Sequence, residues 1–195
     1  YDYTMHDGTI LKYRPYLAGE QKLILMAAEG DDIDEIINTV CQVVNNCVVT
    51  KPFNIDTLPL YELDRLVLNI RGRSFGEDIN LSYLCRNKVN DDRVCGNEVK
   101  FSVKVPDVKI VGSIPDKKII LNEENLIGVC MKPPTVELLK HVPLSSLNKA
   151  TSMYKIIEKC IDYVFDETMS YDMKKVTPAE MQEFLMSLPL EQMNK

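Results

Sequence analysis

The sequence has no run of about 18 apolar residues, the length that a helix needs to cross a membrane, so we predict no membrane-spanning segment and no membrane partner. No basic start followed by an apolar stretch marks the chain for secretion. The glycine patterns GxGxxG and GxxxxGK are absent, so no phosphate-binding loop is expected. Residues Gly72-Arg73-Ser74-Phe75-Gly76 match the letters of GxSxG, but they are expected as a turn from a helix into the sheet, so we predict no strand-to-helix elbow that carries a nucleophilic serine.

Histidine is scarce as well. His6 and His141 are expected at a turn and at a helix end, where neither suits general acid–base catalysis. We therefore predict that the protein is not an enzyme and that it has no catalytic and no cofactor-binding residues. The net charge of −6 argues against a nucleic-acid partner, which would require clustered Lys and Arg.

Six cysteines are present at irregular spacings, which is typical of free thiols in a reducing compartment. Cys85 and Cys95 are the weak candidates for a metal site, because they are predicted near the end of one hairpin. A zinc ribbon needs four ligands, usually two closely spaced pairs, whereas nine residues separate these two cysteines and no second pair is evident. We favour a metal-free knuckle without cofactor, and structural zinc is the alternative.

The first 76 residues are predicted to form a hairpin followed by helices. Tyr1, Tyr3 and Met5 alternate with polar residues, Asp7-Gly8 suits a turn, and residues 10–16 are expected to form the return strand of a hairpin. Helices are predicted over 17–28 and 33–47, the second capped by Asp31 or Asp32. A third helix is predicted with Pro59 in its first turn, with Asp56 and Thr57 as caps and with Gly72 and Gly76 as its end.

After Gly76 the apolar period changes from helical to two, which predicts strands over 79–85 and 99–105. Further strands over 108–112 and 118–121 are expected to extend the same sheet, and 125–136 is expected to be strand and then loop. One helical turn is predicted over 137–141. A long helix is predicted from Ser145 or Ser146 through Val164, and a last helix begins with the capping box of Thr177 and Glu180.

These patterns predict an α+β protein with an N-terminal β-hairpin and helices, a central antiparallel sheet with a knuckle-like cysteine hairpin, and C-terminal helices. We divide the chain at 1–76, 77–136 and 137–195, and expect the last part to form one compact unit with the first. Aromatic residues gather near the start and apolar residues in the last helix, as often happens where proteins meet. The predicted partner-binding residues are Tyr1, Tyr3, Tyr13, Phe184, Leu185 and Leu188.

Three stretches of this sequence together resemble one family. They are YRPYLAGEQKLILMAAEGDD at 13–32, NNCVVTKPFNIDTLPLYELDRLVLNIRGRSFGEDINLSYLC at 45–85, and KVTPAEMQEFLMSLPLEQMNK at 175–195. Their arrangement is similar to that of the baseplate hub subunits and hub assembly proteins of T-even-type, contractile-tailed phages. The resemblance implies a CxxC-like knuckle, which relatives often carry, at the place where this chain has Cys85 and Cys95, and the wider spacing here argues against a metal.

The resemblance implies a non-enzymatic structural component of the tail baseplate hub. It implies binding to other hub and tail proteins within a multi-subunit assembly, location in the virion, and assembly in the host cytoplasm. Two alternatives stay open. One is a transient hub assembly chaperone that is absent from the mature virion, and the other is a small zinc-ribbon-like adaptor protein.

Overall fold

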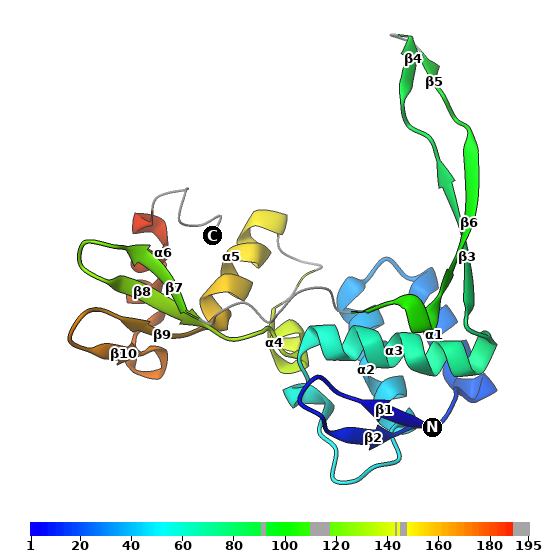
Figure 1. Ribbon diagram of the computed structural model, residues 1–195, viewed down its shortest axis with the longest axis horizontal. Coiled ribbons are helices and arrows are strands. Elements are labelled where there is room, and N and C mark those ends of the chain that lie inside the picture. Colours follow the sequence, from blue (N-terminus) through cyan, green and yellow to red (C-terminus); the bar gives the residue numbers. More distant parts are fainter. Residues whose placement is uncertain (91–92, 110–117, 143, 145–147, 189–195) are drawn as a thin grey trace.

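The computed structural model describes residues 1–90, 93–109, 118–142, 144 and 148–188. It combines α-helices with antiparallel strand pairs, so the predicted α+β class is confirmed. Figure 1 shows a helical body that contains the N-terminus, a long hairpin that rises away from it, and a second, smaller layered region near the C-terminus. Within the described residues, no helix is both long and apolar enough to cross a membrane.

The helical body begins with the predicted hairpin. Strand β1 (Asp2–Thr4) pairs antiparallel with β2 (Ile10–Lys12), and Gly8 in the turn has a φ of +86°, which suits glycine. Helices α1 (Ala18–Glu29) and α2 (Ile33–Cys47) follow close to their predicted bounds. The Asp32 side chain accepts hydrogen bonds from the backbone N–H groups of the first turn of α2, which confirms it as the cap.

Helix α3 (Leu60–Phe75) differs from its prediction at both ends. Asp56 and Thr57 do not cap it, because they belong to the short 3-10 helix η1 (Ile55–Thr57). Gly72 does not end it either: α3 continues to Phe75, and Gly76, with a φ of +94°, follows its last turn. A Cβ at Gly72 would lie 3.4 Å from the side chain of Val105, so this glycine allows a close approach between α3 and the segment after the long hairpin.

One apolar cluster unites the helical body. It contains buried side chains from the N-terminal hairpin, from α2 and α3, and from Val136 at the start of α4 (Val136–His141). The chain returns to this body through backbone hydrogen bonds from Leu60 N–H to Pro134 O and from Val136 N–H to Leu58 O. The predicted helical turn at 137–141 is thus confirmed, and it closes the core that the first 76 residues begin.

The long hairpin, which we name the arm, comprises residues 78–104. Its strands β3 (Asp78–Leu84) and β6 (Glu98–Lys104) pair antiparallel along their whole length, as predicted, and the short strands β4 (Lys88–Asn90) and β5 (Arg93–Val94) lie nearer its tip. The expected extension of this sheet is wrong, because β3 and β6 form a separate two-stranded sheet. Of the strand predicted over 108–112, Val108 and Lys109 are not in a strand, and the remaining residues lie outside the described part of the chain.

Residues 118–121 instead belong to a four-stranded antiparallel sheet near the C-terminus. Its order is β10-β9-β8-β7, with β7 (Lys118–Asn122), β8 (Ile127–Met131), β9 (Ile161–Phe165) and β10 (Ser170–Asp172). The predicted long helix is therefore too long. Helix α5 (Lys149–Cys160) is capped by Asn148 and ends where the β-prone sequence IDYVF begins β9; Ser145 and Ser146 lie outside the described residues.

A second apolar cluster joins this sheet to α6 (Pro178–Ser187), with buried Leu121, Val129, Ile161, Met181 and Leu185. The predicted capping box is confirmed, because Thr177 Oγ1 accepts from Glu180 N–H and the Glu180 carboxylate accepts from Thr177 N–H. The buried side chains thus group by these two clusters rather than at the predicted boundaries 77 and 137. The division at 1–76, 77–136 and 137–195, with the last part in one compact unit with the first, stays a prediction.

Candidate functional site

The arm has one apolar face and one polar face. Directly paired residues on its apolar face are Ile79 with Val103, Leu81 with Phe101, and Tyr83 with Val99. The opposite face is formed by the alternating residues, including the pairs Asn80 with Ser102 and Ser82 with Lys100. This is the period-two pattern of a sheet that packs one face against other protein.

No described part of the chain covers the outer half of that apolar face. The exposed fractions are 43% for Leu81, 57% for Tyr83, 47% for Val99 and 47% for Phe101. With large side chains each presenting on the order of 100 Å², the face offers roughly 400 Å² of apolar surface, the size of a typical interaction patch. A two-stranded hairpin is marginally stable alone, so a bound partner would also stabilise the arm.

The base of the arm is held firmly against the body. Val105 begins the 3-10 helix η2 (Val105–Asp107), is buried against Gly72 of α3, and donates its N–H to Glu77 O at 2.9 Å. Arg73 at the end of α3 forms an ion pair with Glu77 at 2.9 Å. The arm is therefore fixed where it begins and ends, while its apolar face stays open further out.

Cys85 and Cys95 lie on the two opposing chain segments of the arm, as predicted. Directly after Cys95, Gly96 and Asn97 form a β-bulge opposite Cys85, because Gly96 N–H donates to Cys85 O while Cys85 N–H donates to Asn97 O, and Gly96 has a φ of +68°. Both thiols are free, Cys85 half-buried and Cys95 exposed. Within the described residues, no three His, Cys, Asp or Glu side chains gather to hold a metal ion. Two thiols alone supply half of a tetrahedral zinc site.

The predicted partner-binding residues fall in different environments. Tyr1 is exposed, whereas Tyr3 and Tyr13 are buried in the first apolar cluster. In α6, Leu185 is buried in the second cluster, and Phe184 and Leu188 are half-buried against it. The structure does not bring these two groups together in one apolar cluster, and the buried members serve the core rather than an open surface.

Tyr3 is part of a buried polar network at the first turn of α3. Its hydroxyl donates to the carboxylate of Glu62, which is 1% exposed and also accepts from the backbone N–H of His6 at 2.6 Å. Arg65 lies 3.6 Å from the same carboxylate and stacks over the Tyr3 ring. Burial, and next the hydrogen bond to Glu62, raise the pKa of the Tyr3 hydroxyl well above its usual value.

Because Tyr3 supports the fold, Tyr3→Phe is expected to lower the free energy of unfolding by about 1–2 kcal/mol, the contribution of one hydrogen bond to a buried carboxylate. Urea denaturation measures this, with Tyr1→Phe as the matched control that leaves stability unchanged. A Tyr3→Phe protein of normal stability that binds its partner less well would instead place Tyr3 at the interface.

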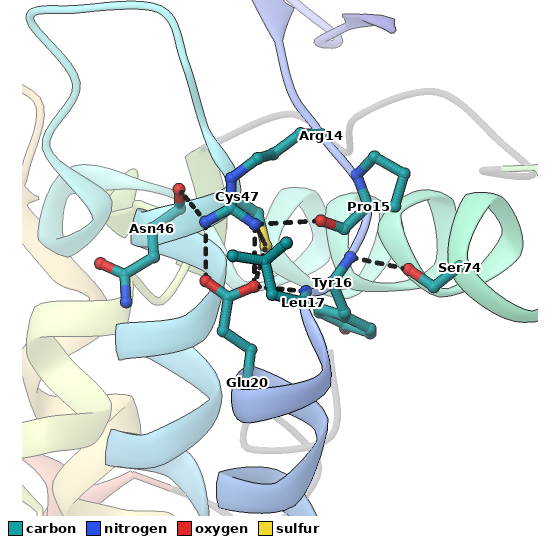
Figure 2. A network of polar contacts seen from close by, with 8 residues as sticks. All are labelled: Arg14, Pro15, Tyr16, Leu17, Glu20, Asn46, Cys47 and Ser74. Atoms are coloured by element: carbon teal, nitrogen blue, oxygen red, sulfur yellow. Dashed lines mark hydrogen bonds and ion pairs between the residues drawn. The ribbon is translucent and has the colours of Figure 1, made fainter.

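A second polar network joins the hairpin exit to α1, α2 and α3 (Figure 2), the last through Tyr16 N–H, which donates to Ser74 Oγ at 2.9 Å. Sequence reasoning did not find this network. The Arg14 guanidinium forms a bidentate ion pair with Glu20 at 2.7 and 2.8 Å, and also donates to the backbone oxygens of Pro15 and Asn46. Glu20 accepts from Leu17 N–H and thereby stabilises the start of α1. The sequence offers one indication of this network, namely an arginine and a glutamate six residues apart on either side of a helix start. Only the folded structure shows that the two side chains meet.

The geometry defines a class before any comparison: a small α+β protein with two packed cores that presents an open, apolar-faced arm, as subunits of assemblies do. The family described as T4 bacteriophage base plate protein matches residues 1–195, the whole chain. The protein belongs to this family, and it is therefore a phage baseplate protein, a part of a multi-subunit tail assembly. The predicted baseplate family is thereby confirmed. No curated protein and no solved structure gives a significant match.

Proposed function

We propose that the protein is a non-enzymatic structural component of the baseplate hub, which binds other hub and tail proteins during and after assembly in the host cytoplasm. The observation that carries the proposal is the open apolar face of the arm, with Leu81, Tyr83, Val99 and Phe101 exposed on one side of a two-stranded sheet. Membership of a baseplate family supports it, because a baseplate subunit must cover such a face with a neighbouring subunit.

The form of the arm favours a docked protein neighbour over a small ligand. Its apolar face is long and narrow, and each strand also has an outer edge of backbone groups that pairs with no strand in the described residues. A neighbouring chain can pack side chains against the face and add a strand to an edge. Both contacts become available along the same part of the arm, which makes it suited to joining subunits.

Retention in the virion separates the structural component from the transient chaperone. Quantitative mass spectrometry of purified virions is expected to find the chain at a small fixed copy number, in constant ratio to other baseplate proteins. Abundance in the infected-cell lysate together with absence from virions would contradict the structural role and establish the chaperone instead.

Metal content distinguishes the structural component and the chaperone, on one side, from the zinc-ribbon-like adaptor on the other. Elemental analysis of the purified protein is expected to find less than one zinc per ten chains, because Cys85 and Cys95 provide only two ligands. Stoichiometric zinc that Cys85→Ser and Cys95→Ser both remove would overturn this expectation. It would give the arm a metal-stabilised tip.

A further inference from the structure

A cleft of about 560 Å³ lies at the base of the arm and is separate from the arm's apolar face. Residues at the end of β1, the exposed side of α3 and the η2 segment surround it. Its basic members are His6, Arg65 and Lys109, and its apolar members include Val105, Pro106 and Val108. Its volume falls within the range of about 300–1,000 Å³ that is usual for ligand sites.

The charge of this cleft is opposite to that of the whole chain. The protein has a net charge of −6, yet none of the described residues that line the cleft is acidic. Lys109 is exposed and has no acidic partner within ion-pair distance among the described residues. An anionic group that entered the cleft would therefore meet attraction from its charged side chains.

Contacts with Tyr3 and Glu62 hold the Arg65 guanidinium in place. Its guanidinium carbon lies 5.3 Å from the centre of the Tyr3 ring, and one of its nitrogens lies 3.6 Å from the buried Glu62 carboxylate. The same carboxylate accepts hydrogen bonds from the Tyr3 hydroxyl and from His6 N–H, and its contact with Arg65 is a single one at 3.6 Å, which leaves the other guanidinium N–H groups available. The Arg65 side chain is 30% exposed. A planar guanidinium with donors to spare is well suited to a carboxylate.

We propose that this cleft binds an acidic segment of another protein chain, with carboxylates at Arg65 and Lys109 and an apolar side chain against Val105 and Val108. Charge complementarity selects the carboxylates, and the apolar members select a peptide over a free anion. Val108 is 40% exposed, which leaves apolar surface for such a side chain to cover. Among the described residues that line the cleft, Arg65 and Lys109 are the two cationic side chains. Two are too few to bind a nucleic-acid backbone, which depends on many phosphate contacts.

The test uses the full-length chain and a fluorescein-labelled octapeptide of alternating glutamate and leucine, followed by fluorescence anisotropy at low salt. The companion peptide has glutamine in place of every glutamate. The cleft variant is Lys109→Glu, and the matched control is Lys88→Glu, an identical charge change at an exposed position far out on the arm. Neither position belongs to an apolar cluster, so both variants are expected to keep the wild-type unfolding temperature.

We expect the glutamate peptide to bind at least tenfold more tightly than the glutamine peptide. Lys109→Glu should weaken that binding at least tenfold, whereas Lys88→Glu should change it less than twofold. Equal loss in both variants would show attraction to overall charge alone and overturn the proposal. A single-stranded oligonucleotide that binds more tightly than the peptide, with the same dependence on Lys109, would assign the cleft to nucleic acid instead. Arm variants should leave peptide binding intact, so failure here is distinguishable from failure of the proposed function.

Discussion

Glu20→Ala is expected to lower the free energy of unfolding by about 3 kcal/mol, because it leaves the guanidinium of Arg14 without its bidentate partner. The Glu20 side chain is 10% exposed, and it joins the hairpin exit to the start of α1 (Figure 2). Cys47 at the end of α2 also contacts this carboxylate, with its Sγ 3.7 Å from Oε2. One substitution therefore loosens the hairpin exit, α1 and the end of α2.

Urea denaturation measures the loss, and Glu29→Ala provides a matched control. Glu29 lies at the end of the same helix but is exposed, so its replacement should change stability by less than about 0.5 kcal/mol. Equal effects of the two substitutions would contradict a structural role for the Arg14–Glu20 pair.

The same carboxylate predicts a pH dependence. The hydrogen bonds from Arg14, and to a lesser extent that from Leu17 N–H, lower the pKa of Glu20 from 4.5 to about 2, against the opposing effect of burial. A folded-state pKa below the unfolded value stabilises the folded protein above pH 4.5, and this contribution disappears as the pH falls from 4.5 to about 2. The stability difference between wild type and Glu20→Gln should therefore shrink over that interval. A difference that stays constant from pH 6 to pH 2.5 would contradict the lowered pKa.

Gly128→Ala is expected to destabilise the C-terminal sheet by about 2–3 kcal/mol, because the new methyl group has no room. Gly128 in β8 pairs directly with Phe165 of β9, whose ring covers the glycine. A Cβ there would lie 2.4 Å from the Phe165 ring and 2.7 Å from the backbone oxygen of Ile119. The ring can move aside, but the backbone oxygen cannot do so without disturbing the pairing of β7 with β8.

The matched control is Gly19→Ala in the first turn of α1, where a Cβ would meet nothing within 4 Å. Alanine there should be neutral or stabilising by about 0.5 kcal/mol, because it favours helix. Hydrogen exchange of the β7, β8 and β9 amides, with urea denaturation, measures both. Unchanged protection of these strands in Gly128→Ala would show that the sheet adjusts more easily than its geometry indicates.

The sequence predicted local structure well wherever a short-range cause sets it. The turn at Gly8, the Asp32 cap and the Thr177–Glu180 capping box depend on residues a few positions apart, and each was confirmed. The two long strands of the arm were also predicted, because alternating apolar and polar residues place side chains on opposite faces of a strand.

What the sequence could not show was which elements meet over long distances. The apolar, β-branched run at 119–121 indicates a strand but does not say whether β6 or β8 is its partner, so the sheet was assigned wrongly. Helical spacing continues from α5 past Cys160, and pairing of Ile161 with Met131 overrides it. Tyr1 and Tyr3 occupy equivalent alternating positions in the sequence. Only the folded protein shows that Tyr3 is buried and hydrogen-bonded to Glu62, whereas Tyr1 is exposed.

The central claim, that the apolar face of the arm binds another baseplate protein, is tested most directly by a pair of double variants. Leu81→Ser with Phe101→Ser alters one directly paired couple on the apolar face, and Asn80→Ala with Ser102→Ala alters the neighbouring couple on the polar face. All four residues lie outside both apolar clusters, so both variants should keep the wild-type unfolding temperature within about 3 °C.

The measurement is the amount of identified baseplate proteins that co-purifies with the tagged chain from infected cells, determined by quantitative mass spectrometry. We predict that the Leu81 and Phe101 variant loses at least nine-tenths of these partners, whereas the Asn80 and Ser102 variant retains them. Equal recovery of partners by both folded variants would contradict the account and move the interface elsewhere on the protein.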